Sequence, residues 1–206
     1  MWDDRVLLDR LQHAVEAYRE LGALDSLSHT LLMLSMSEAA AGQLAAAHTR
    51  AEEARRFAGA TGYAVGRLAS TLTNAKLLAW QGEDEAAQRV TDDMSAMAEY
   101  LGVEDLNRSA WQAQMIMHLG RGRYREVYTI APRTTAGDSA RHDTEALPTL
   151  IEAGMRIGER KAAATALQQL QVMATASGTP WALGLLARSA ALLATDSAAE
   201  PLYQES

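Results

Sequence analysis

Glycine recurs at a fixed interval of 20 residues through the first 122 positions of this sequence. Glycine adopts the left-handed conformation that ends a helix at little cost, so it favours helix C-termini. The residues between these glycines are mostly good helix formers. The spacing therefore predicts an array of helices of about 17 residues, each ended by a glycine of the series. The series consists of Gly22, Gly42, Gly62, Gly82, Gly102 and Gly122.

Apolar residues between these glycines recur with the i, i+3, i+4, i+7 spacing of amphipathic helices. The segment 24–41 carries two apolar stripes instead of one, so we expect its helix to be packed between neighbours. In this part of the chain, helices are predicted over 4–21, 24–41, 43–60, 64–81, 83–101 and 106–119.

The regular spacing falters after Gly122. A shorter helix is predicted over 123–131, ending before Pro132, and the polar segment 132–145 predicts a surface loop of about 14 residues. Thr179 followed by Pro180 is a good helix start, because threonine caps free amides and proline fits the first turn. The segment 196–206 is typical of an amphipathic helix that is cut off, so we expect a fragment of a longer chain. The remaining helices are predicted over 146–157, 159–177 and 180–194, with Gly158 and Gly178 between them.

The composition favours an all-α protein, because alanine, leucine and methionine are abundant while Phe57 is the one phenylalanine. The hairpin period is near 40 residues, whereas tetratricopeptide repeats use 34 and HEAT and armadillo repeats ~40–47, so the period alone does not choose between these types. A pair of small residues follows three of the glycines, at 46–47, 86–87 and 162–163. These pairs favour tetratricopeptide-like packing. We therefore predict a single domain over 1–206, an α-solenoid of antiparallel helical hairpins.

Charge and composition exclude several classes of function. The chain has 19 Lys and Arg against 26 Asp and Glu, a net charge of −7, which disfavours direct binding to nucleic acid. It has no cysteine and hence no disulfide or thiolate metal site. We find neither a signal peptide at the start nor an apolar run long enough to span a membrane. A cytoplasmic protein with no membrane attachment is expected.

The sequence carries no motif of a known catalytic site. The phosphate-binding pattern GxxxxGK[ST], the nucleophile elbow GxSxG and the zinc motif HExxH are all missing, and the five histidines are scattered. We therefore predict no enzyme activity, no catalytic residue, no metal and no cofactor. An all-helical enzyme would require a site that these motifs do not describe.

Candidate binding residues are aromatic and charged side chains on the predicted helices. The aromatic candidates would line a ligand cavity, although tryptophan in helical arrays more often fills the core. They are Trp80, Trp111, Tyr124 and Trp181. Glu152 and Arg156 lie one turn apart and form either a buried structural tie or a ligand clamp. The arginines at 121, 123, 125 and 133 would meet an acidic partner or a phosphate, or belong to an exposed turn beside Glu126. The predicted groove residues are Trp80, Trp111, Tyr124, Glu152, Arg156, Trp181 and Arg188.

Several segments resemble one protein family. Residues 147–158 read LPTLIEAGMRIG, and residues 178–193 read GTPWALGLLARSAALL. They are similar to the patterns LPxLVEAAxRxG and GTxWALGxxARxxALL in the helical-repeat region of large ATP-binding transcriptional regulators of the LuxR family. Residues 119–124 resemble the LGxGRY segment of that family, 21–24 contain its GAL segment, and 199–206 resemble its AExxYxxA segment. Gly154 and Ser206 depart from these patterns, which have alanine at both positions.

The resemblance implies a middle region between an N-terminal ATPase and a C-terminal helix-turn-helix module, both absent from this sequence. In such regulators the repeat region senses an inducer and takes part in interactions that control assembly. We therefore expect a protein or small-molecule inducer as the partner of a bacterial regulator's sensor segment. The alternative is a stand-alone tetratricopeptide-like adaptor that binds peptide segments of a protein partner. The oligomeric state is left open.

Overall fold

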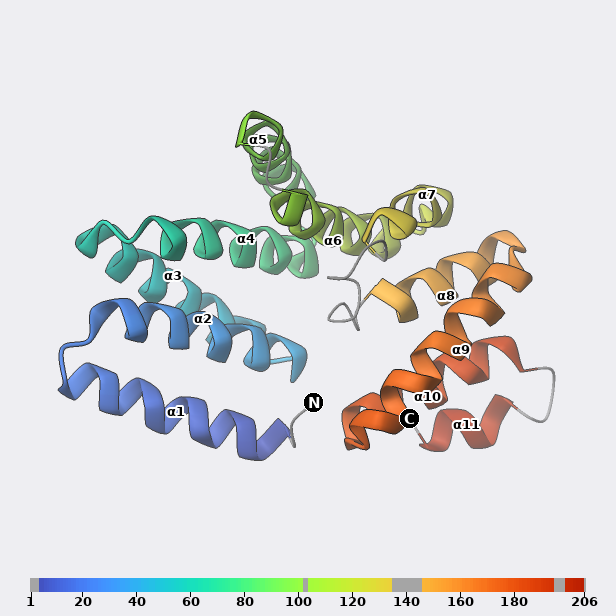
Figure 1. Ribbon diagram of the computed structural model, residues 1–206. Helices are drawn as coiled ribbons and strands as arrows, with labels where there is room; N and C mark the ends of the chain where they lie inside the picture. The colour runs from blue at the N-terminus through green and yellow to red at the C-terminus, as the bar shows by residue number, and fades with distance from the viewer. Residues whose placement is uncertain (1–3, 102–103, 135–145, 195–198, 206) are drawn as a thin grey trace. The chain divides into compact units, whose positions relative to one another are not determined.

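The computed structural model describes residues 4–101, 104–134, 146–194 and 199–205. These residues form eleven α-helices and no strand, which confirms the all-α prediction (Figure 1). The helices group into two compact units, one from Asp4 to Ala113 and one from Gln114 onward. Each unit is described by itself.

The first unit contains five complete helices and the start of a sixth, with α1 to α4 side by side (Figure 1). Each helix begins 20 residues after the previous one, as the glycine spacing predicts. Their bounds are α1 (Asp4–Glu20), α2 (Leu24–Ala40), α3 (Leu44–Thr61), α4 (Ala64–Gln81), α5 (Asp84–Leu101) and α6 (Glu104–Gly120).

Glycine ends these helices as predicted. At Gly42 the backbone φ is 78°, its N–H bonds the carbonyl of Ala39 at 2.9 Å, and the N–H of Gln43 bonds that of Glu38 at 2.8 Å. This pair of hydrogen bonds is the Schellman arrangement, which satisfies carbonyls that the end of a helix leaves open. Gly102 lies outside the described residues. The other helix-ending glycines with positive φ are Gly22, Gly62, Gly82, Gly122, Gly158 and Gly178.

Helix α2 is the centre of the first unit. It contacts α1, α3 and α4, and Leu27, Leu31 and Leu34 are at most 1% exposed, which confirms the expected position between neighbours. Helix α3 packs closely on it because its buried residues are all alanine.

Two serines of α2 fix its register on α3. The hydroxyls of Ser28 and Ser35 donate to the carbonyls of Ala54 and Ala47, at 3.0 and 2.7 Å. The earlier serine bonds the later alanine, so the two helices are antiparallel. All four residues are fully buried.

The second unit holds the rest of α6 and five further helices. Consecutive helices from α7 to α11 pack against each other, and α8 also contacts α10. Thr179 caps α10 as predicted, since its Oγ1 accepts from the N–H of Ala182 at 3.3 Å and Pro180 is in the first turn. The bounds are α7 (Tyr124–Thr134), α8 (Ala146–Ile157), α9 (Arg160–Ser177), α10 (Pro180–Leu193) and α11 (Ala199–Glu205).

The prediction that the helix after Gly122 ends before Pro132 is wrong. Helix α7 continues through Pro132 to Thr134. Only two residues of the helix follow Pro132, so its missing N–H and the strain of its ring affect only the last turn. The extra residues bury Thr134, whose hydroxyl bonds the carbonyl of Ala131 at 2.9 Å. The rest of the predicted loop, 135–145, and the start of the predicted last helix, 196–198, lie outside the described residues.

The packing of consecutive helices is compatible with a helical solenoid. The tetratricopeptide-like type, the antiparallel hairpin period of 40 residues and the single domain over 1–206 stay predictions. The small pairs show one shared pattern, because Ala47, Ala87 and Ala163 are fully buried while the residue before each is half-buried. Among the helices described, none has both the length and the apolar content that a membrane span requires.

Candidate functional site

Tyr124 and Arg156 form the first contact of the candidate site, in the second unit. Tyr124 begins α7 and is half-buried, whereas Arg156 lies in the last turn of α8 and is exposed. The guanidinium carbon of Arg156 lies 5.7 Å from the centroid of the Tyr124 ring. A guanidinium at this distance is attracted by the electron-rich face of the ring. The contact therefore ties the end of α8 to the start of α7.

Glu152 and Arg188 form the second contact. Nη2 of Arg188 donates to Oε2 of Glu152 at 2.6 Å, with side chains 48% and 15% exposed. The pair joins α8 to α10. Because one member is half-exposed, it contributes only about 0–1 kcal/mol to stability.

The predicted tie between Glu152 and Arg156 is not formed. Within the described part of the chain, Glu152 makes its ion pair with Arg188, and Arg156 turns to Tyr124 instead. The packing of α10 on α8 brings Arg188 to the carboxylate, 36 residues along the chain. From the sequence alone, Arg156, one helical turn away, was the expected partner of Glu152.

Trp181 extends this group along α10. It lies in the first turn of α10, two turns before Arg188, so the two residues share one face of the helix. Its side chain is half-buried. Five of the seven predicted groove residues thus follow each other over α7, α8 and α10. We call them the binding strip: Tyr124, Arg156, Glu152, Arg188 and Trp181.

The other two predicted residues belong to the first unit. Trp80 is half-buried and packs against a core cluster that includes Ala39, Ala51 and Leu77, as expected of a core tryptophan. Trp111 is half-buried in α6. The seven residues therefore form two groups, and a single groove that they all line stays a prediction.

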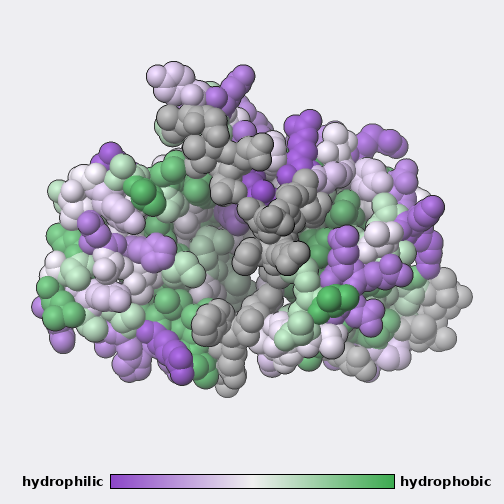
Figure 2. All heavy atoms as spheres, in the orientation of Figure 1, coloured by the Kyte–Doolittle hydropathy of each residue, from purple (hydrophilic) through white to green (hydrophobic). Residues whose placement is uncertain are grey.

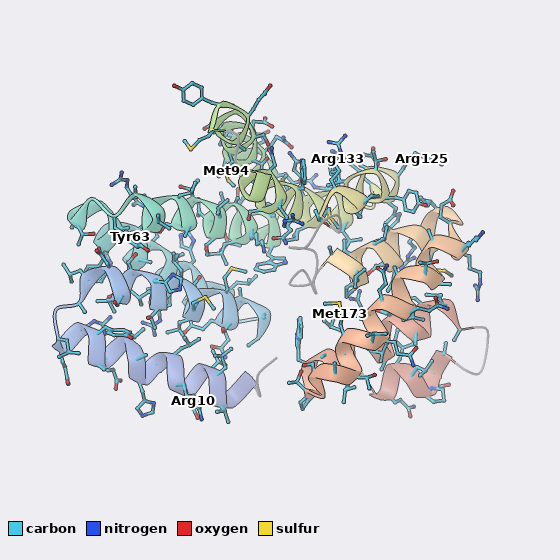
Figure 3. All side chains as sticks on the ribbon, in the orientation of Figure 1. Arg10, Tyr63, Met94, Arg125, Arg133 and Met173 are labelled. Carbon is cyan, nitrogen blue, oxygen red and sulfur yellow. The ribbon has the colours of Figure 1, made fainter. Side chains whose placement is uncertain are left out.

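The predicted arginine cluster lies beside the binding strip. Arg123 and Arg125 flank Tyr124 in the sequence and are exposed, as is Glu126. In the part of the chain that the structure describes, neither Arg123, Arg125 nor Arg156 has a carboxylate within 4.0 Å. Figure 3 shows Arg125 and Arg133 on α7. Hydrophilic residues gather over α7 and the turn between α8 and α9 (Figure 2).

Two side chains with shifted pKa values, Glu52 and Arg55, lie elsewhere, on α3. The hydrogen bond from Arg55 lowers the pKa of Glu52 below its ordinary value of 4.5, against the opposing effect of partial desolvation. The same contact raises the pKa of Arg55. No group of three or more His, Asp or Glu residues in the described segments is placed to hold a metal ion. The aromatic rings and guanidinium groups of the binding strip suit recognition by stacking, ion pairing and hydrogen bonding.

Glu38 is a buried charged residue that the sequence did not single out. It is 3% exposed near the end of α2, and its Oε1 lies 3.5 Å from Nε of Arg50 on α3. Among the residues that the structure describes, its Oε2 finds no hydrogen-bond partner. In the sequence Glu38 looked like any exposed acidic residue near a helix end, since only the packing of α2 buries it.

Comparisons of the chain with protein-family models, with curated proteins and with solved structures gave no match.

Proposed function

We propose that this chain is the sensor and protein-interaction segment of a bacterial transcriptional regulator, with the binding strip as its recognition surface. The observation that carries the proposal is that five separately predicted residues lie on three helices, α8 and its neighbours α7 and α10, with two contacts joining four of them. Each of the five is also a fixed letter of the segments that resemble the LuxR-family regulators. Tyr124 comes from LGxGRY, Glu152 and Arg156 from LPxLVEAAxRxG, and Trp181 and Arg188 from GTxWALGxxARxxALL.

The strip offers two kinds of contact to a partner. Tyr124 and Trp181 present partly exposed aromatic rings, and tyrosine and tryptophan are favoured at binding surfaces because one edge is apolar and the other polar. Arg156 and Arg188 present exposed guanidinium groups, which bind carboxylates or phosphates with two hydrogen bonds. A small-molecule inducer or a protein segment with an anionic group beside an apolar one would suit this surface.

The mechanism follows from the contacts that a ligand would replace. An anionic ligand on Arg188 competes with Glu152, and one on Arg156 competes with the ring of Tyr124. Both contacts hold α8 to its neighbours and are worth little each, so a ligand of modest affinity shifts their balance. Changed packing among α7, α8 and α10 would then bias flanking ATPase and DNA-binding modules. The segment itself needs no cofactor and no nucleic acid for this role.

Ligand binding to the isolated chain tests the proposal. A panel of sugars, organic acids and nucleotides is screened by thermal denaturation and titration calorimetry, and bacterial lysate is screened by pull-down. A ligand at ~100 times its Kd stabilises the folded state by about 2.7 kcal/mol. We expect a hit that the double variant Arg156→Ala and Arg188→Ala loses.

Arg55→Ala is the matched control, because it also removes an exposed arginine from an ion pair, on α3 in the first unit. It should bind the hit as the wild type does. A folded wild-type sample that binds neither any member of the panel nor any lysate protein would contradict the proposal. So would a hit that the double variant retains with unchanged affinity.

A further inference from the structure

Three arginines lie around Tyr124, and Glu126 is the one acidic residue among positions 121–134 of the sequence. Arg123 and Arg125 are exposed on either side of Tyr124, and the exposed guanidinium of Arg156 lies over its ring. The described residues place no carboxylate within ion-pair distance of any of the three. We call these residues the arginine surface. It stands out in a chain whose net charge is −7.

The negative charge of the chain is concentrated in one segment. Residues 83–105 hold eight acidic residues and one basic residue, Arg89, so this segment has a net charge of −7, the same as the whole chain. Most of the segment is helix α5. Asp92, Asp93 and Glu99 are exposed there.

Apolar side chains accompany these carboxylates on α5. Tyr100 is 89% exposed and Met97 is 48% exposed, although the solvent-exposed face of a helix is expected to be polar. Asp93, Ala96 and Tyr100 lie one helical turn apart, opposite buried residues such as Met94 and Ala98. We call Asp92, Asp93, Met97, Glu99 and Tyr100 the α5 face. Tyrosine and methionine are enriched where proteins bind each other.

We propose that two copies of this chain associate, with the arginine surface of one copy bound to the α5 face of the other. The argument is charge complementarity, because arginines with no described carboxylate within 4.0 Å and the excess carboxylates of residues 83–105 belong to the same sequence. Guanidinium groups pair with Asp92, Asp93 and Glu99, while Tyr100 and Met97 supply the apolar contact that charges alone lack. Charge pairs of this kind steer encounter and select the partner. The inference does not depend on the proposed regulatory function.

Charge exchange between the two surfaces tests the inference. Sedimentation velocity and light scattering measure the mass of the full chain over a range of concentrations and salt. We expect the wild-type mass to rise with protein concentration and to fall in ~0.5 M NaCl, where charges are screened beyond a few ångströms. The variant Arg123→Glu with Arg125→Glu, and the variant Asp92→Lys with Asp93→Lys, should each raise the dissociation constant at least about tenfold.

The combined variant, with all four charges exchanged, restores opposite charges and should recover association. The control is Arg10→Glu with Arg67→Glu, which makes the same change in net charge as Arg123→Glu with Arg125→Glu, but at exposed arginines of α1 and α4. The control should associate as the wild type does. Circular dichroism checks that every variant is folded.

A wild type that is monomeric at every concentration in low salt would overturn the inference. So would undiminished association of either reversed pair, or a folded combined variant that stays as weak as the single reversals. A monomeric chain that still binds an inducer would leave the proposed function standing. A chain that associates but binds no ligand would support this inference and contradict the proposed function.

Discussion

Two glycines within helices, Gly59 and Gly66, differ in the space that an added methyl group would have. A Cβ added at Gly59 in α3 would meet no atom within 4 Å, whereas one at Gly66 in α4 would lie 2.4 Å from Cδ1 of Tyr63 and 3.1 Å from Cβ of Ala58. Tyr63 precedes α4 (Figure 3). Gly59→Ala should therefore raise the free energy of unfolding by about 0.5–1 kcal/mol. Gly66→Ala should lower it by about 1–3 kcal/mol, as measured by urea denaturation.

Removing the ring shows whether Tyr63 is the cause. In a Tyr63→Ala background, Gly66→Ala should lose most of its cost, because the closest atom is gone. Equal urea midpoints for the two single glycine variants would mean that the ring moves aside without cost, against the expectation.

The ion pair between Glu52 and Arg55 predicts a small acid dependence of stability. Because the pKa of Glu52 is lowered in the folded state, its contribution is fully present above the ordinary value of 4.5 and is lost as the pH falls through the folded pKa. The pair is exposed, so about 0.3–0.5 kcal/mol is involved. Glu52→Gln should be less stable than the wild type at pH 7, with the difference lost as the pH falls through the folded pKa of Glu52. A constant difference across thermal unfolding curves from pH ~3 to ~7 would refute this cause.

At the scale of helices, the small pairs predict where packing is tight. Ala87 of α5 is fully buried while Ala86 is half-buried. Ala87→Leu should therefore lower the free energy of unfolding by about 1–3 kcal/mol through overpacking, and Ala86→Leu should cost clearly less. Urea midpoints measure both, and Ala162→Leu against Ala163→Leu in α9 repeats the comparison. Equal costs within each pair would show that the alanines do not set the approach of the helices.

Helix positions were predictable from sequence because their signals are local. Each helix-ending glycine and the capping pair Thr179–Pro180 act within one turn, and those in the described part of the chain are found as predicted. The end of α7 was missed because the helix continues past Pro132 to the fully buried Thr134, whose burial no local pattern records. The residue types of the binding strip were predictable, but the partner of Glu152 was not. That partner depends on how α10 packs against α8, which no local pattern records.

The whole molecule should lose its structure unit by unit. In arrays of helices each element packs mainly on its neighbours, so stability is close to a sum of local terms. Leu31 in the first unit and Ile151 in the second are both fully buried. Either residue changed to alanine should cost about 2–5 kcal/mol. Hydrogen exchange followed by mass spectrometry should then show faster exchange within the altered unit only.

The two variants serve as controls for each other, since they make a similar cavity in different units. Leu31→Ala should accelerate exchange in α1 to α4 and leave α8 to α10 near wild-type rates, and Ile151→Ala should do the reverse. Equal acceleration over all helices in both variants would mean that the chain unfolds as one cooperative body. Local unfolding matters for the proposed function, because a ligand on α7, α8 and α10 could then change their order without unfolding the remaining helices.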